Sequence, residues 1–209
     1  IGQDIPGVSS VTYDDFQAAK RITQLIIQKG RQNIAFIGVD EADQAVGVMR
    51  KKGFIKAMED GNLPICNEWM AQANFDIPSG YEAMSRIMEQ SSESRRPDAV
   101  FCVTERIAIG AMQFLKESGY QIPTQFSIAG IGASDISKYV EPALTTMDYE
   151  NETAGKEAAK FLLDQIERNE NRQKKVVLNG RLIVRNSIIT TIRSLIILFI
   201  VCYRYNHHI

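Results

Sequence analysis

The chain has 209 residues, with 24 Lys and Arg against 25 Asp and Glu and a formal net charge of −1. Hydrophobic residues make up 44% and charged residues 23%, close to an average soluble globular protein, which excludes a disordered chain, a collagen-like repeat, a disulfide scaffold and a multi-span membrane protein. The balanced charge also argues against a chain that grips nucleic acid by itself, because such binding needs a dense basic patch.

The first half of the chain predicts helices that alternate with short strands. Asp14 and Asp15 suit the first turn of a helix, because acidic side chains there face the positive end of the helix dipole. The apolar run at 34–39 predicts a strand buried on both faces. In chain order we expect a short apolar start at 1–5, a helix from Asp14 to Lys29-Gly30, a strand at 34–39, a helix at about 44–59, a short strand near 68–73 and a helix over 79–90 capped by Pro78-Ser79.

The second half continues this alternation and ends in a predicted hairpin. We expect a buried strand at 99–103, a helix at 105–117, a strand at 126–131, a further segment from 144–147 and a long helix at 151–169. Two short apolar runs, 176–178 and 182–184, then flank Asn179-Gly180, a dipeptide that strongly favours a two-residue hairpin turn.

Strands that alternate with helices of about ten or more residues indicate βαβ units and a parallel sheet. Right-handed crossovers place the helices on both faces of such a sheet. The sequence therefore predicts an α/β protein with a doubly wound, mostly parallel sheet. Ligands of these folds bind beyond the carboxyl ends of the strands, so polar residues directly after each strand are the candidates for a site.

Those loops carry mixed polar groups, each with a structural alternative. Arg50 could donate paired hydrogen bonds to two sugar hydroxyls or to a carboxylate, or it could be a surface arginine. Phe75 could be a platform for the apolar face of a ring, or pack in the core. Thr104 and Glu105 suit an N-cap and a first-turn acid, whatever else they do. Asp135 could accept a hydroxyl hydrogen bond or simply be a turn residue.

Nothing in the sequence requires an enzyme, a metal or a cofactor. Both histidines, His207 and His208, lie in the last three residues, so the rest of the chain lacks the commonest general base and metal ligand. Cys66, Cys102 and Cys202 match no Cys-x-x-Cys spacing and indicate reduced thiols in a cytoplasmic protein. No dinucleotide fingerprint, phosphate loop, nucleophile elbow or zinc-protease motif occurs.

Five segments stand in a distinctive order and spacing: SVTYDDFQAAKRITQLIIQKGRQNIAFIGV, VGVMRKKGFIKAM, PDAVFCVTERIAIGAMQFLKESGYQIPTQFSIAGIG, PALTTMDYENETAGKEAA and RLIVRNS. Together they resemble the LacI/GalR family of bacterial sugar-responsive transcriptional regulators. The runs AVGVMRKKGF, GIGASD and LTTMDYENE are similar to sucrose- or trehalose-type repressors. The resemblance implies a periplasmic-binding-protein-like fold of two lobes joined by three crossover strands.

The resemblance also implies an organisation and a set of partners. The segments would be the end of an N-terminal lobe with the first crossover at 1–11, a C-terminal effector-binding lobe at 12–143, a crossover and return helix of the N-terminal lobe at 144–172, final C-terminal-lobe strands at 173–187 and an atypical apolar tail at 188–209. A sugar or sugar phosphate would bind between the lobes and shift the balance of lobe arrangements. The protein would be a cytoplasmic homodimer without enzymatic activity. It would contact operator DNA only through a helix-turn-helix that this chain lacks, and it would contact no membrane.

Carried over position by position, the resemblance implies an effector site. Its members would be Tyr13, Arg50, Phe75, Thr104, Glu105, Gly132, Asp135 and Asn151. Two departures stand out. Thr104-Glu105 replaces the usual Asn/Asp-Asp pair, and Gly132 stands where the family commonly has Asp, which removes acceptors that relatives use for sugar hydroxyls.

The two ends of the chain differ from its body. The first residue is Ile1, with no Met and no basic segment, so we expect an internal start and see no signal peptide. The apolar stretch 195–201 is too short to span a bilayer, which needs roughly 17–25 residues. A frayed or β-rich extension, a tail anchor and a partner-binding strand all remain open for 188–209. A periplasmic-type sugar-binding protein and an α/β enzyme acting on sugars remain the alternative functions.

Overall fold

The computed structural model describes residues 2, 4, 6–92, 95–168 and 173–188. Its strands are β1 (Ser10–Tyr13), β2 (Ile34–Gly38), β3 (Met70–Gln72), β4 (Ala99–Cys102), β5 (Ser127–Gly132), β6 (Thr145–Asp148), β7 (Lys175–Leu178) and β8 (Arg181–Ile183). Its helices are α1 (Asp15–Gln28), a π-helical turn at Gln44–Met49, α2 (Arg50–Asp60), a 3-10 turn at Asn67–Trp69, α3 (Ile77–Gln90), α4 (Glu105–Glu117), α5 (Ile136–Tyr139) and α6 (Asn151–Arg168).

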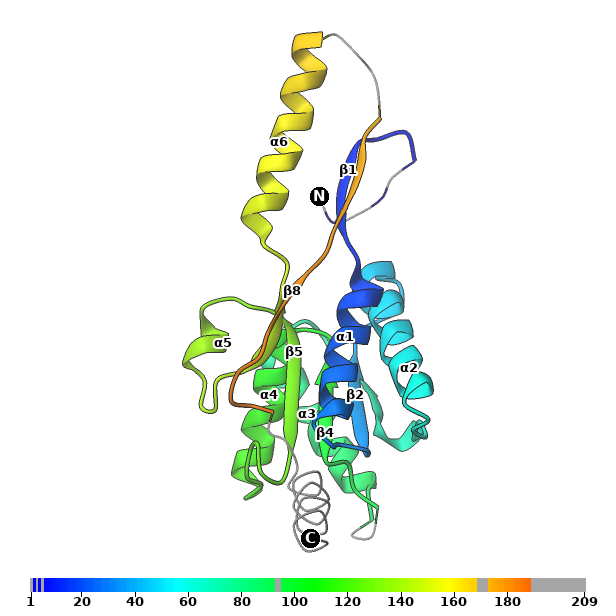
Figure 1. Ribbon diagram of the computed structural model, residues 1–209. Coiled ribbons are helices and arrows are strands. Elements are labelled where there is room, and N and C mark those ends of the chain that lie inside the picture. The colour runs from blue at the N-terminus through cyan, green and yellow to red at the C-terminus, as the bar shows by residue number, and fades with distance from the viewer. Residues whose placement is uncertain (1, 3, 5, 93–94, 169–172, 189–209) are drawn as a thin grey trace, which may run out of the picture.

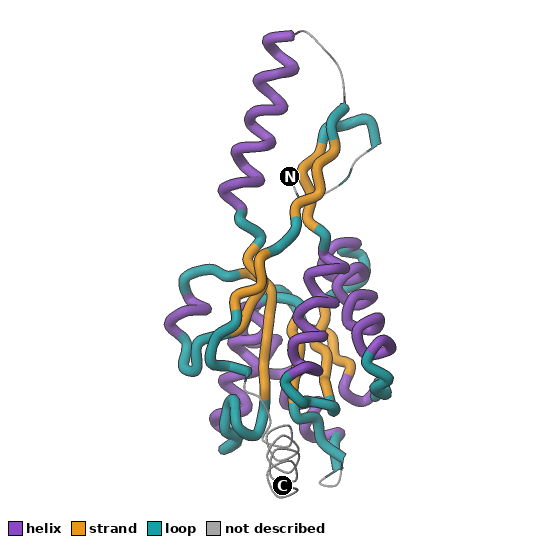
Figure 2. Tube along the Cα trace, in the orientation of Figure 1, coloured by secondary structure: helices purple, strands orange, loops and turns teal. Residues whose placement is uncertain are grey.

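The body of the molecule is a six-stranded sheet with helices on both faces. Its strand order is β3-β2-β4-β5-β6-β8, and every neighbouring pair is parallel except β6 and β8. Helix α1 packs on α2 and α3 packs on α4, one pair on each face (Figures 1 and 2). Strands β2 and β4 are buried along their whole length, as their apolar sequences predict. The predicted α/β architecture is confirmed.

A second, smaller unit stands above this body. Strand β1 pairs with β7 in a parallel two-stranded sheet, and α6 lies beside it (Figure 1). Val11, Ala154 and Phe161 form the small core between them. Residues 175–178, expected among the final strands of the C-terminal lobe, therefore belong to this smaller sheet, and the boundary expected after residue 11 falls inside β1.

The predicted hairpin around Asn179-Gly180 is wrong. Strand β7 pairs with β1, whereas β8 pairs with β6, so the chain runs on from one sheet into the other (Figure 2). A type I′ turn needs positive φ at both central residues, and neither residue has it. Gly180 instead packs tightly on β6, where an added Cβ would lie 2.5 Å from Met147 Cγ. Arg21 donates a hydrogen bond to the Gly180 carbonyl at 3.0 Å, which anchors the segment that connects β7 to β8.

Most other expected elements occur with small shifts at their ends. The helix expected at 44–59 begins as a π-helical turn and becomes α-helical at Arg50. The helix expected from Ser79 starts at Ile77, because the Asp76 side chain, and not Pro78-Ser79, accepts the capping hydrogen bond from the Ser79 amide at 2.8 Å. The predicted tail at 188–209 lies outside the described residues except for Ile188, which is buried against the main core.

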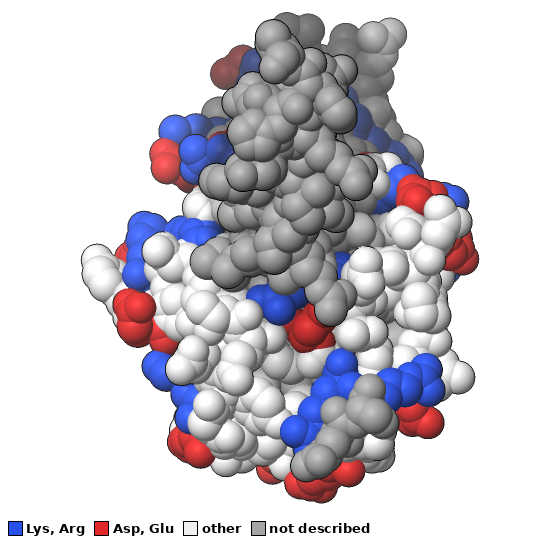
Figure 3. Space-filling model, turned by 60° about the horizontal axis from the view of Figure 1, so that its bottom comes forward, with Lys and Arg blue, Asp and Glu red and all other residues white. Residues whose placement is uncertain are grey.

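The outer surface carries both signs of charge. On the bottom face, Figure 3 shows Lys and Arg near Asp and Glu at several places, separated by areas of other residues. Among the described residues, no helix is both long enough and apolar enough to cross a membrane.

The α3–α4 contact depends on glycine at its closest points. An added Cβ at Gly110 would lie 2.0 Å from the Ile77 carbonyl oxygen. We expect Gly110→Ala to lower the free energy of unfolding by about 2–3 kcal/mol, because the helices must separate. Gly155 in α6 has no heavy atom within 4 Å of such a Cβ, so Gly155→Ala should raise stability by up to about 1 kcal/mol. Urea unfolding measures both, and equal effects of the two would contradict this packing.

Candidate functional site

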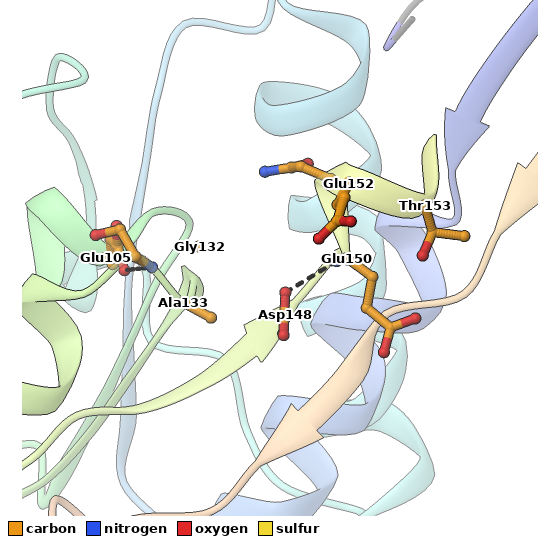
Figure 4. A pocket seen from close by; sticks show the side chains of 9 residues that line it. Glu105, Gly132, Ala133, Asp148, Glu150, Glu152 and Thr153 are labelled. Atoms are coloured by element: carbon orange, nitrogen blue, oxygen red, sulfur yellow. Dashed lines mark hydrogen bonds between the residues drawn. The ribbon is translucent and has the colours of Figure 1, made fainter. Parts of the chain in front are cut away.

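A cavity of about 630 Å³ lies where the large sheet meets the small unit. It is bounded by the carboxyl ends of β5 and β6 and by the first turn of α6, which is where α/β sheets bind ligands. Figure 4 shows Glu105, Gly132 and Ala133 on one side, and Asp148 and the start of α6 on the other. The lining includes four carboxylates and no Lys or Arg side chain.

Two of the lining residues have a strained backbone. Ala133 has φ of 64° and Glu150 has φ of 49°, in the left-handed region that side chains other than glycine avoid. Asn62 is the other non-glycine residue with positive φ in the described part of the chain. Because such strain persists only where the surrounding structure holds it, its concentration at this cavity supports a functional role.

Glu105 and Gly132 form one contact on the cavity wall. Glu105 is only 8% exposed, although it begins α4, and its Oε2 accepts a hydrogen bond from the Ser134 amide at 2.9 Å. Thr104 caps the same helix, since its Oγ1 accepts from the Ile107 amide. The expected capping role of Thr104 is thus confirmed, and Thr104 itself does not line the cavity.

The opposite wall is acidic and partly ion-paired. Asp148 Oδ2 lies 3.1 Å from Nη2 of Arg181, and Asp148 Oδ1 accepts a hydrogen bond from the Glu150 amide at 2.9 Å. Glu150 lies 3.5 Å from Nε of the same arginine. Strand β8 supplies Arg181, so the antiparallel pairing of β6 with β8 places this cation next to both carboxylates.

Arg50 lies in a buried ion pair with Asp15. Its Nε donates to Asp15 Oδ1 at 2.7 Å, and both residues are 7% exposed. Nη1 donates to the Val103 carbonyl, and the guanidinium lies 5.3 Å from the centre of the Tyr149 ring. The surface-arginine interpretation is wrong, and Arg50 does not line the cavity.

Two stacked tyrosines connect this ion pair to the cavity. Tyr13 and Tyr149 have ring centres 4.4 Å apart with planes 12° apart. Tyr149 donates its hydroxyl proton to Asp15 at 2.6 Å, and Tyr13 donates to Asn151 Oδ1 at 2.7 Å. Burial raises the pKa of both tyrosines, so both stay protonated donors at neutral pH. Asn151 lines the cavity and thereby joins β1 to its wall.

Two of the expected site residues lie apart from this cavity. Phe75 is 50% exposed, so it is not the core residue that its alternative interpretation proposed. Asp135 is exposed and pairs with Lys138 at 2.8 Å, which lowers the pKa of Asp135. Neither residue lines the cavity.

Of the eight expected residues, the cavity brings together Glu105, Gly132 and Asn151. Sequence reasoning missed Asp148 and Glu150, which also line it. Their signal was present, because they follow directly after the strand expected at 144–147. Asp15 was interpreted only as a helix-start acid, and its burial has no signature in the local sequence.

A family model described as a periplasmic binding protein-like domain matches residues 23–188. The chain belongs to this family. Similar curated proteins include the HTH-type transcriptional repressor PurR of Yersinia pestis, 32% identical over 179 residues that cover 86% of this chain and 51% of the repressor. The chain thus spans about half the length of the curated relatives it matches.

Solved structures of the family's regulators have the same fold. A transcriptional regulator CelR–cellobiose complex matches with a TM-score of 0.80 and 27% identity, covering 90% of this chain and 56% of that one. A LacI family regulator from Enterococcus faecium with bound ribose matches with a TM-score of 0.79 and 25% identity, covering 90% and 68%. The predicted resemblance to the LacI/GalR regulators is confirmed. The relatives are transcriptional regulators, which does not favour the alternative of an exported sugar-binding protein.

Proposed function

We propose that this periplasmic binding protein-like domain binds a small-molecule effector, a sugar or a sugar phosphate, and forms the dimerising core of a LacI-type transcriptional regulator. The observation that carries the proposal is the polar cavity at the carboxyl ends of β5 and β6, in a family whose solved members include cellobiose and ribose complexes. The eight residues carried over from the resemblance remain our candidates, with Glu105, Gly132 and Asn151 in direct contact with the effector.

The position of the cavity supports a mechanism. It lies between the large sheet and the unit of β1, β7 and α6, so an effector there contacts both. A ligand shifts an equilibrium between arrangements only by its different affinity for each. The hydrogen bond of Tyr13 with Asn151 links β1 to the cavity wall. Closure around an effector would therefore move the smaller unit.

The remaining parts of the proposal concern the whole regulator. Leu162, Leu163 and Ile166 on α6 and Val177 on β7 are exposed, and we propose that the rest of an N-terminal lobe covers them. Operator DNA would be bound by a helix-turn-helix outside these 209 residues, in the cytoplasm, by a homodimer whose paired heads match two half-sites. We expect no enzymatic activity, and the narrower sucrose- or trehalose-type assignment remains a prediction.

Calorimetric titration tests the proposal. The longest form of the protein that the gene encodes is titrated with a panel of neutral sugars and sugar phosphates, and operator binding is measured with and without each of them. We expect one compound to bind and to change the affinity for DNA. If none of the panel binds, the effector-binding proposal fails.

A further inference from the structure

Three of the four carboxylates that line the cavity have a basic partner. Asp148 and Glu150 approach Arg181 at 3.1 and 3.5 Å, and Glu152 pairs at 2.6 Å with a lysine one turn further along α6. Glu105 differs, because it makes no ion pair with any described residue. It is also the most buried of the four. The site therefore holds one buried carboxylate that forms no ion pair with the described residues.

One oxygen of Glu105 is held by a backbone amide, and the other is accessible to solvent. Oε2 accepts the Ser134 amide hydrogen bond at 2.9 Å, whereas Oε1 accepts no hydrogen bond from the described residues. Oε1 is not among the described polar atoms that are buried without a partner, so water reaches it, and a ligand group that donates a hydrogen bond would take the place of that water. An ionised carboxylate only accepts hydrogen bonds, so a ligand hydroxyl satisfies it and an ionised phosphate does not.

Gly132 makes room for this side chain. A Cβ at position 132 would lie 2.7 Å from Cδ and 2.8 Å from Cγ of Glu105, and the φ of Gly132 is +157°. Any larger residue there would push the Glu105 carboxylate from its place. Glycine at 132 and glutamate at 105 therefore act together, and the acidic group reaches the cavity from the start of α4 rather than from the end of β5 (Figure 4).

We propose that Glu105 is the specificity-determining residue of the effector site, and that it selects an uncharged, polyhydroxylated ligand over the phosphate ester of the same compound. The inference rests on the proposed function and narrows its ligand class. A phosphate monoester carries about −1.5 to −2 charges at pH 7. The cavity would place that charge next to the unpaired Glu105 carboxylate, and no Lys or Arg is among the lining residues.

Matched sugar pairs test this selectivity by calorimetry. The longest form of the protein is titrated with glucose, ribose, trehalose and sucrose, and with glucose 6-phosphate, ribose 5-phosphate, trehalose 6-phosphate and sucrose 6-phosphate. We expect at least one neutral sugar to bind about tenfold or more tightly than its phosphate. A phosphate that binds as tightly as its neutral partner overturns this inference and leaves the effector-binding proposal standing. If no member of any pair binds, both fail.

Variants assign the selectivity to Glu105. Glu105→Gln keeps the shape and removes the charge, so we expect it to weaken binding of the neutral sugar about 10- to 100-fold and to narrow its preference over the phosphate. Gly132→Ala should cause a similar loss by displacing Glu105. Glu82→Gln makes the same chemical change on the exposed side of α3 and should leave the preference unaltered. Thermal melts confirm that each variant is folded, and an unchanged preference in folded Glu105→Gln overturns the inference.

Discussion

Replacement of Asp15 by Ala is expected to lower the free energy of unfolding by about 3–5 kcal/mol. Asp15 Oδ1 accepts hydrogen bonds from Arg50 Nε and from the Tyr149 hydroxyl, at 2.7 and 2.6 Å. Without it, the buried Arg50 charge keeps only the Val103 carbonyl and the face of the Tyr149 ring. Removing one partner of a buried pair costs more than the pair contributes, because an uncompensated charge remains inside the protein.

Urea unfolding followed by circular dichroism measures this effect, with Asp14→Ala as the matched control. Asp14 only caps α1, accepting from the Gln17 amide at 2.9 Å, so its loss should cost about 1 kcal/mol. The double variant Asp15→Leu, Arg50→Met should lose less unfolding free energy than the summed losses of Asp15→Leu and Arg50→Met alone. In the double variant neither charge remains without its partner. Additive losses, or a cost at Asp15 no larger than at Asp14, would contradict the buried pair.

Replacement of Arg31 is expected to have the second-largest effect, a loss of about 2–4 kcal/mol for Arg31→Met. The buried guanidinium donates to Ser127 Oγ at 2.9 Å and to three carbonyls, those of Pro123, Thr124 and Gln125. Without it, these acceptors at the start of β5 lose their donor. Burial lowers the pKa of Arg31, and the charge of Asp98 opposes that shift.

The same unfolding measurements test Arg31 through two comparisons. Arg31→Lys keeps the charge but replaces a planar fork by a single ammonium, so it should recover only part of the lost stability. Arg106→Met on the exposed side of α4 should change stability by less than about 0.5 kcal/mol. A full recovery by lysine would show that charge alone, and not the four-acceptor geometry, accounts for the role of Arg31.

The alternation of helices and strands could be predicted because the local spacing of apolar residues indicates which side chains become buried. Continuous apolar runs predicted β2 and β4, and helical spacing with a capping residue predicted α1 and α4 almost to the residue. The turn at Asn179-Gly180 could not be predicted in the same way. Its dipeptide favours a hairpin locally, but pairing of the flanking strands with β1 and β6 outweighs that preference.

The candidate site was predictable only in part. Position after a strand and the family resemblance placed Glu105, Gly132 and Asn151 on the cavity wall. They could not separate Arg50 as an effector ligand from Arg50 as one half of a buried pair, because its partner Asp15 is 35 residues away along the chain. Adjacent carboxylates at 14 and 15 look alike in the sequence, and only folding makes one a cap and the other a buried anion.

The sequence by itself determined the class of fold, the family and the absence of histidine from residues 1–206, since these depend on composition, periodicity and ordered motifs. The tertiary structure decided where charges are compensated. Arg181, Arg50 and Lys156 form ion pairs with carboxylates of the site and its surroundings, whereas Glu105 has an amide on one oxygen and no ion pair with the described residues. Electrostatic pairing acts through space between distant segments, so no local pattern of residues records it.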